Sequence, residues 1–169
     1  MTKPSAKNHW ELHIERLVPL KRHVAYRVMR NHISDWWWHP SVNSGLHHFI
    51  DWRPSGRFAI TDMFGTVVQE SIILDLRHGW YFQMTDAFRV GGQPAMPTMV
   101  GHWSFMSTPR DHQSYEAVQV NGDCSTFSTK IRHFSEADYL RSKALGFEQG
   151  WNDAADRLVT ICSTRPRPV

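Results

Sequence analysis

Apolar and polar residues alternate along much of this chain, which predicts β-strands. Between residues 9 and 17, Trp10, Leu12 and Ile14 alternate with charged or polar residues, as in a strand with one buried face. The same kind of segment recurs at 46–52, 57–63, 67–76, 80–85, 99–106 and 126–134. Short connections without helices separate most of these segments, so they predict an antiparallel meander.

Two connections between the strands have distinctive turn residues. Arg53-Pro54-Ser55-Gly56 predicts a type I turn, because Pro occupies its second position and Gly its fourth. Segment 88–97 contains a Gly-Gly pair and two prolines, and it predicts a loop.

Two short helices are predicted directly after the first strand, at residues 21–29 and 32–38. The second contains three consecutive tryptophans. Because consecutive residues point in different directions around a helix axis, we expect Trp37 or Trp38 in the core and Trp36 partly exposed.

The last predicted element is a long helix. Ser135 is followed three residues later by Asp138, an N-cap pattern. An apolar stripe at spacings of four and three then runs through about six helical turns. Its members are Leu140, Ala144, Phe147, Trp151, Ala154, Leu158 and Ile161. Gly146 and Gly150 share a face inside this stretch, and we expect them to let the helix approach the sheet closely.

Composition and charge narrow the class of protein. The 169 residues are 41% hydrophobic and 21% charged, which is typical of a single globular domain. We expect a disordered segment at 1–8, one domain at 9–162 and a Pro-rich tail at 163–169. The net charge is only +3 and no basic stripe is evident, so we expect no nucleic-acid partner.

The N-terminal residues and the two cysteines bear on location. Residues 1–8 are polar and lack the apolar run of a signal peptide, and no segment has the roughly 20 apolar residues of a membrane helix. We therefore expect a cytoplasmic protein with no membrane partner; a homodimer stays open. Cys124 and Cys162 have no CxxC spacing, and a pair of buried thiols is expected, with a single disulfide as the alternative.

Four passages, in this order along the chain, resemble one known family. They are residues 37–40 (Trp-Trp-His-Pro), 50–58 (Ile-Asp-Trp-Arg-Pro-Ser-Gly-Arg-Phe), 131–138 (Ile-Arg-His-Phe-Ser-Glu-Ala-Asp) and 146–151 (Gly-Phe-Glu-Gln-Gly-Trp). The family is named after the activator of the heat-shock-protein-90 ATPase and belongs to the START-like (SRPBCC, birch-pollen-allergen-like) superfamily. In its hairpin motif a Gly usually stands where this chain has Ser55.

The resemblance spans about residues 10 to 162 and implies the helix-grip fold. This is an α+β architecture: a curved antiparallel sheet wraps around a long C-terminal helix, and two short helices follow the first strand. The chain departs from the family between Met106 and Cys124, where residues 107–123 predict an inserted loop or an extra hairpin.

The resemblance also implies a space between sheet and helix, which some relatives fill with ligand. We expect this space to bind a small, largely apolar molecule, as in a carrier or sensor, since apolar side chains with few polar groups usually line such sites. The predicted ligand-binding residues are Trp80, Phe82, Met84, Met99, Trp103, Phe105, Phe147 and Trp151. The alternative is a solid core made by the same side chains.

Two other functions follow from the resemblance: a cyclase- or hydrolase-like enzyme using the same cavity, and a co-chaperone that activates an ATPase. Asp86, His102 and Arg132 are the candidate acid–base residues, although alternation places His102 on the face opposite Trp103. No nucleophile lies beside a base, so no catalytic residue is assigned.

Neither a metal nor a cofactor is expected, although the chain has eleven histidines. His47 and His48 are adjacent, so in a regular strand they point to opposite faces and cannot bind one ion together. No HExxH spacing is present.

Overall fold

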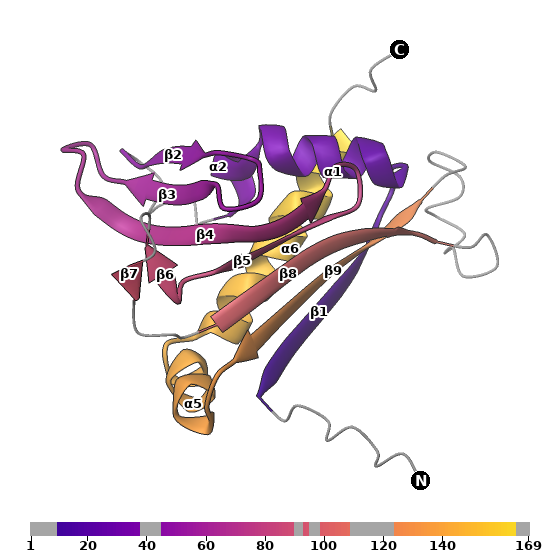
Figure 1. Cartoon of the computed structure of the whole chain (residues 1–169). Helices are drawn as coiled ribbons and strands as arrows, with labels where there is room; N and C mark the ends of the chain where they lie inside the picture. Colours follow the sequence, from indigo (N-terminus) through magenta and orange to yellow (C-terminus); the bar gives the residue numbers. More distant parts are fainter. Residues whose placement is uncertain (1–9, 38–44, 90–92, 95–98, 109–123, 165–169) are drawn as a thin grey trace, which may run out of the picture.

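The computed structural model describes residues 10–37, 45–89, 93–94, 99–108 and 124–164. A curved seven-stranded antiparallel sheet wraps around a C-terminal helix, and two short helices follow the first strand (Figure 1). This is the α+β helix-grip fold that the sequence predicts.

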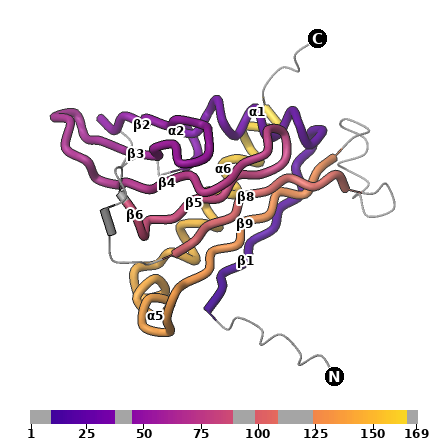
Figure 2. The backbone as a smooth tube through the Cα atoms, in the orientation of Figure 1, coloured from indigo at the N-terminus to yellow at the C-terminus, as the bar shows by residue number. Residues whose placement is uncertain are grey.

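The large sheet contains β1 (Glu11–Val18), β2 (His47–Ile50), β3 (Arg57–Thr61), β4 (Val67–Arg77), β5 (Tyr81–Thr85), β8 (Met99–Ser107) and β9 (Ser125–His133). Their spatial order is β1-β9-β8-β5-β4-β3-β2. Figure 2 shows β1 beside β9, although the two strands lie far apart in sequence. Across the sheet Trp103 lies opposite Phe82 on β5 and Thr129 on β9, so these three side chains share the inner face.

Part of the predicted loop at 88–97 forms a small second sheet, which corrects that prediction. β6 (Phe88–Arg89) pairs antiparallel with β7 (Gln93–Pro94). Strands of two residues are too short to show an alternating pattern, so they could not be predicted from periodicity. The predicted insertion lies outside the described residues except for Ser107 and Thr108.

The helices are α1 (Arg22–Asn31), α2 (Ile33–Trp36), α5 (Glu136–Ala144) and α6 (Phe147–Thr164). The Ser135 hydroxyl accepts a hydrogen bond from the Asp138 amide at 3.1 Å, which confirms the predicted N-cap. The prediction of one continuous helix is wrong. Gly146 has φ of +76°, a left-handed conformation that ends α5 and that Gly adopts most easily.

The break changes which apolar residues are buried. Leu140 is 56% exposed and Phe147 is 42% exposed, whereas the α6 residues that pack inward begin at Trp151. Gly150 was expected to allow close packing, but a Cβ placed there would meet no atom within 4 Å. The buried part of the stripe therefore belongs to α6 alone and consists of Trp151, Ala154 and Leu158, while Ile161 is partly buried.

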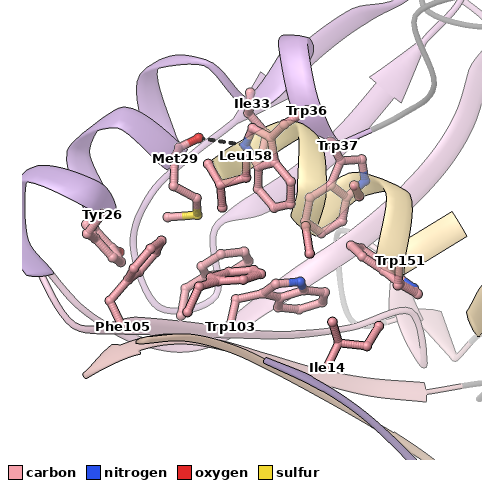
Figure 3. Packing of buried hydrophobic residues seen from close by; sticks show 14 of the residues in the cluster. Ile14, Tyr26, Met29, Ile33, Trp36, Trp37, Trp103, Phe105, Trp151 and Leu158 are labelled. Atoms are coloured by element: carbon pink, nitrogen blue, oxygen red, sulfur yellow. Dashed lines mark hydrogen bonds between the residues drawn. The ribbon is translucent and has the colours of Figure 1, made fainter. Parts of the chain in front are cut away.

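The core is built around aromatic side chains from α1, α2, α6 and the sheet (Figure 3). Trp36 is fully buried, so the prediction that it is partly exposed is wrong. Its indole N–H donates to the carbonyl oxygen of Met29 at 2.9 Å, and this hydrogen bond removes the cost of burying a polar group. Trp37 is buried as expected, and Trp38 lies outside the described residues.

The predicted turn at Arg53–Gly56 forms, and the Gly56 amide donates to the Arg53 carbonyl oxygen at 2.9 Å. Its type differs from the prediction. Ser55, at the third position, has φ of +61°, whereas that position of a type I turn has a negative φ.

Candidate functional site

One cavity of about 390 Å³ lies beside the N-terminal half of α6. Its other walls come from the residue that follows α2, the first residues of β4 and β8, and the residue that follows β5. The residues that line it, here called the α6 cavity, are Trp37, Val68, Gln69, Asp86, Met99, Phe147, Gly150, Trp151, Asp153 and Arg157. Val68 and Phe147 are 54% and 42% exposed, so the cavity opens to solvent between β4 and the start of α6.

Two tryptophans form the inner wall of the α6 cavity. The rings of Trp37 and Trp151 meet edge to face, with centroids 4.8 Å apart and planes at 86° (Figure 3). Phe147 lies one helical turn before Trp151, so both side chains project from the same side of α6. The helical break at Gly146 starts α6 at this point and so places Phe147 at the entrance.

Four polar residues lie at the same cavity. The guanidinium of Arg157 donates to the Trp36 carbonyl oxygen from Nε at 3.3 Å and from Nη2 at 3.2 Å. Burial lowers the pKa of Arg157, while Asp153 and Asp156 act in the opposite direction. Arg157 therefore supplies a fixed polar group next to apolar walls, and the Gln69 side chain lies at the same cavity.

Asp86 follows β5 and faces the same space. One of its carboxylate oxygens accepts from the Met99 amide at 3.0 Å, which fixes the side chain against the start of β8. The cavity thus has an acidic group as well as the guanidinium of Arg157, and its lining is apolar with a small number of oriented polar groups.

The structure divides the predicted ligand-binding residues into three groups. Met99, Phe147 and Trp151 line the α6 cavity. Phe82, Met84, Trp103 and Phe105 are fully buried in the core. Trp80 lies outside both groups, against the guanidinium groups of Arg22 and Arg77.

The inner space between sheet and helix is filled by aromatic rings. Trp103 stacks on Phe82 with centroids 4.8 Å apart, and Trp37 packs on Phe58 at 4.9 Å. The solid core and the cavity therefore coexist: rings fill the middle of the sheet, and the open space lies at one end.

The three candidate acid–base residues do not come together. Asp86 lines the α6 cavity, whereas His102 and Arg132 lie in a depression on the outer face of the sheet. Burial lowers the pKa of His102, as do the nearby charges of Lys130 and Arg132. The sheet separates His102 and Arg132 from Asp86, so these residues do not form one reaction centre.

Sequence reasoning missed several residues that line the cavity: Val68, Gln69, Gly150, Asp153 and Arg157. Gly150 carried a signal, since a glycine inside a helix costs about 1 kcal/mol against alanine and calls for a local explanation. The polar residues carried none, because exposed helix positions and cavity positions look alike in sequence.

Among the described residues, no group of three or more histidine, cysteine or acidic side chains is arranged to hold a metal ion. Cys124 and Cys162 are both buried thiols, as the sequence predicts. Burial raises the pKa of Cys162 to about 12, so this thiol stays protonated and unreactive near neutral pH.

No protein-family model matches the sequence, and no curated protein matches it. Solved structures do share the fold. A protein from Nitrosomonas europaea aligns with 90% of this chain and 93% of its own, with a TM-score of 0.66 and 15% identity. A protein from Mycobacterium smegmatis aligns with 98% of this chain and 99% of its own, with a TM-score of 0.62 and 14% identity. A protein from Mesorhizobium loti aligns with 93% of this chain and 99% of its own, with a TM-score of 0.60 and 15% identity.

At such low identity the likeness shows the fold alone. The fold and the cavity together define a helix-grip α+β protein with a solvent-open, mainly apolar cavity beside its last helix. Within the described part of the chain, none of the helices has the length and apolar character needed to cross a membrane.

Proposed function

We propose that this protein binds a small, largely apolar molecule in the α6 cavity, as a carrier or sensor. The observation that supports this is the cavity itself: about 390 Å³, walled by Trp37 and Trp151 and open at Phe147. Ligand sites are typically apolar cavities of about 300–1,000 Å³ with a few oriented polar groups. We also propose membership of the activator-related family within the START-like superfamily, on the four sequence passages that resemble it.

The lining favours a ligand with an apolar body and one polar group. The two indole rings offer flat apolar surface, which suits an aromatic or otherwise rigid ring system. Gln69 and Arg157 offer hydrogen-bond donors, so the polar group of the ligand faces them. The entrance between Val68 and Phe147 gives a route from solvent.

Gly150 provides the sharpest test, because a side chain added there points into open space. Gly150→Phe places a ring in the cavity, whereas Gly150→Ala adds one methyl group and removes the helix cost of glycine. The probe is N-phenyl-1-naphthylamine, an uncharged apolar dye, titrated while protein and dye fluorescence are followed. We expect binding by the wild type and by Gly150→Ala, and at least a tenfold loss of affinity in Gly150→Phe.

Thermal unfolding of the three proteins serves as the control for folding. Gly150→Phe is expected to unfold at or near the wild-type temperature, because its ring fills space that is already present. Equal dye affinity in Gly150→Phe and Gly150→Ala would refute binding in the α6 cavity. Absence of saturable binding by the wild type across a panel of apolar probes would refute the binding function.

A further inference from the structure

Several arginines lie on α1 and at the C-terminal end of β4, which is the end opposite the α6 cavity. Figure 1 shows this end of β4 next to α1. The guanidinium carbon of Arg22 lies 3.9 Å from the centre of the Trp80 ring, and that of Arg77 lies 4.2 Å from it. Nearby, Nη1 of Arg30 donates to Nδ1 of His78 at 3.3 Å. Stacking uses the faces of the Arg22 and Arg77 groups and makes no hydrogen bond with their N–H groups.

These positive charges have no acidic partner within the described part of the chain. No carboxylate there forms an ion pair with Arg22, Arg27, Arg30 or Arg77. The nearest acid in sequence, Asp75, accepts a hydrogen bond from a tyrosine hydroxyl at 2.7 Å. Two guanidinium groups on one indole repel each other, and an anion bound between them would relieve this repulsion.

A buried nitrogen atom in this cluster lacks a hydrogen bond. Nε of Arg22 is buried and has no hydrogen-bond partner among the residues that the structure describes. Buried polar atoms in proteins are nearly always hydrogen-bonded, so each exception calls for an explanation.

The start of α1 contributes further positive potential. Lys21, the N-cap residue, makes no side-chain capping bond, and the first turn contains no acidic residue. The N-terminus of a helix carries a partial positive charge and commonly binds anions. Here that end coincides with Arg22, so the helix and the side chain reinforce each other.

We propose that Arg22, Arg77 and Trp80 form a binding site for a phosphate-type anion. Because both guanidinium carbons lie about 4 Å from the same ring centre, they are at most about 8 Å apart. In the proposed complex a phosphate lies at the edge of the indole ring and accepts hydrogen bonds of about 2.8 Å from both guanidinium groups. The site does not depend on the α6 cavity, so it stands apart from the proposed ligand-binding function.

Pyrophosphate is the probe for this site, titrated at constant ionic strength into the full chain and followed by calorimetry. The indole N–H resonance of Trp80, assigned with Trp80→Phe, gives a second readout at the site itself. We expect saturable binding, and at least a tenfold loss of affinity in Arg22→Gln and in Arg77→Gln. Arg141→Gln removes the same charge from the exposed face of α5 and is expected to bind as the wild type does.

Vesicles of phosphatidylcholine doped with phosphatidic acid distinguish a lipid headgroup from a free phosphate. Binding to vesicles but not to pyrophosphate assigns the site to a lipid phosphate. Binding to pyrophosphate but not to vesicles assigns it to a soluble phosphate compound. Equal affinities in the cluster variants and in Arg141→Gln would overturn the proposal, as would no saturable binding to either probe. Arg77 is exposed at the end of β4, so Arg77→Gln keeps the test valid if Arg22→Gln fails to fold.

Discussion

The indole of Trp103 occupies the space above Gly101, two residues earlier on the same face of β8. A Cβ at position 101 would collide with three atoms of the six-membered ring of this indole. Trp103 in turn packs against Trp37 and Trp151, with ring centroids 5.1 Å and 5.4 Å apart. The absence of a side chain at position 101 therefore helps to set the position of the two tryptophans that wall the α6 cavity.

The first prediction follows from this contact. Gly101→Ala is expected to lower the free energy of unfolding by about 1–3 kcal/mol, because the added methyl group must displace a packed indole. Urea titration measures the loss. In a Trp103→Leu background the indole is gone, so the same substitution is expected to cost much less. An equal cost in both backgrounds would show that the clash with Trp103 is not the cause.

Much of the fold could be predicted because each strand has one buried and one exposed face. Leu12 and Ile14 alternate with polar neighbours, and both are buried as that pattern requires. The break between α5 and α6 could not be predicted from periodicity, since Leu140 and Phe147 continue the helical spacing across it. A glycine inside a helix and a glycine that ends one look alike until the backbone angles are known.

The candidate site was harder to predict than the fold. Alternation placed Phe82, Met99 and Trp103 on one face of the sheet. It did not indicate which of them lie in the middle of the sheet and which lie at its end. This position determines whether a residue is part of the core or lines the cavity. Phe82 and Trp103 lie in the middle of the sheet, under α6 and Trp37, and Met99 lies at its open end. Arg157 was not predicted at all, because its role depends on a carbonyl oxygen of α2, 121 residues away in sequence.

The second prediction concerns the β2–β3 turn, where Ser55 has φ of +61°. A left-handed conformation costs a non-glycine residue roughly 1–2 kcal/mol, and glycine avoids this cost but loses more entropy on folding. Ser55→Gly is therefore expected to raise the free energy of unfolding by up to about 1 kcal/mol. Thermal and urea unfolding measure it, and Ser55→Ala, which keeps the strain, is the matched control. A gain in Ser55→Ala as large as in Ser55→Gly would contradict this account.

The third prediction concerns pH and His102 on the outer face of the sheet. Its pKa is lowered from 6.5, first by burial and then by the charges of Lys130 and Arg132, while Asp75 opposes this. The Gln83 amide donates to its Nδ1 at 3.0 Å, which also requires that nitrogen to be unprotonated. At pH values between the lowered pKa of His102 in the folded chain and 6.5, the unfolded chain binds more protons than the folded chain. Stability therefore falls as the pH drops through that window.

His102→Asn keeps a hydrogen-bond acceptor but removes the titration. Between about pH 7 and about pH 5 this variant is expected to lose less stability than the wild type, as measured by urea unfolding at both pH values. His23→Asn, on the exposed face of α1, is the control for loss of a histidine. If His102→Asn lost as much stability between the two pH values as the wild type does, His102 would not contribute to the pH dependence of stability.

The last prediction concerns the contact that holds α5 against the sheet. His133 is buried, and its Nδ1 donates to the Trp10 carbonyl oxygen at 3.2 Å. Nε2 therefore accepts from the Ser142 hydroxyl at 2.7 Å. Ser142→Ala leaves this buried nitrogen without a partner, which is expected to cost about 1–3 kcal/mol. Hydrogen exchange should then show faster opening of α5 than of α6, because the lost bond anchors α5 alone.

Ser163→Ala is the matched control, since the Ser163 hydroxyl donates to the Val159 carbonyl oxygen on the exposed side of α6. It is expected to change stability by less than about 0.5 kcal/mol. If Ser142→Ala had an equally small effect, and α5 kept its wild-type exchange rate, the hydrogen bond to His133 would not be what holds α5 in place. Packing of Tyr139 against the His133 ring, with centroids 5.5 Å apart, would then be the remaining contact to test.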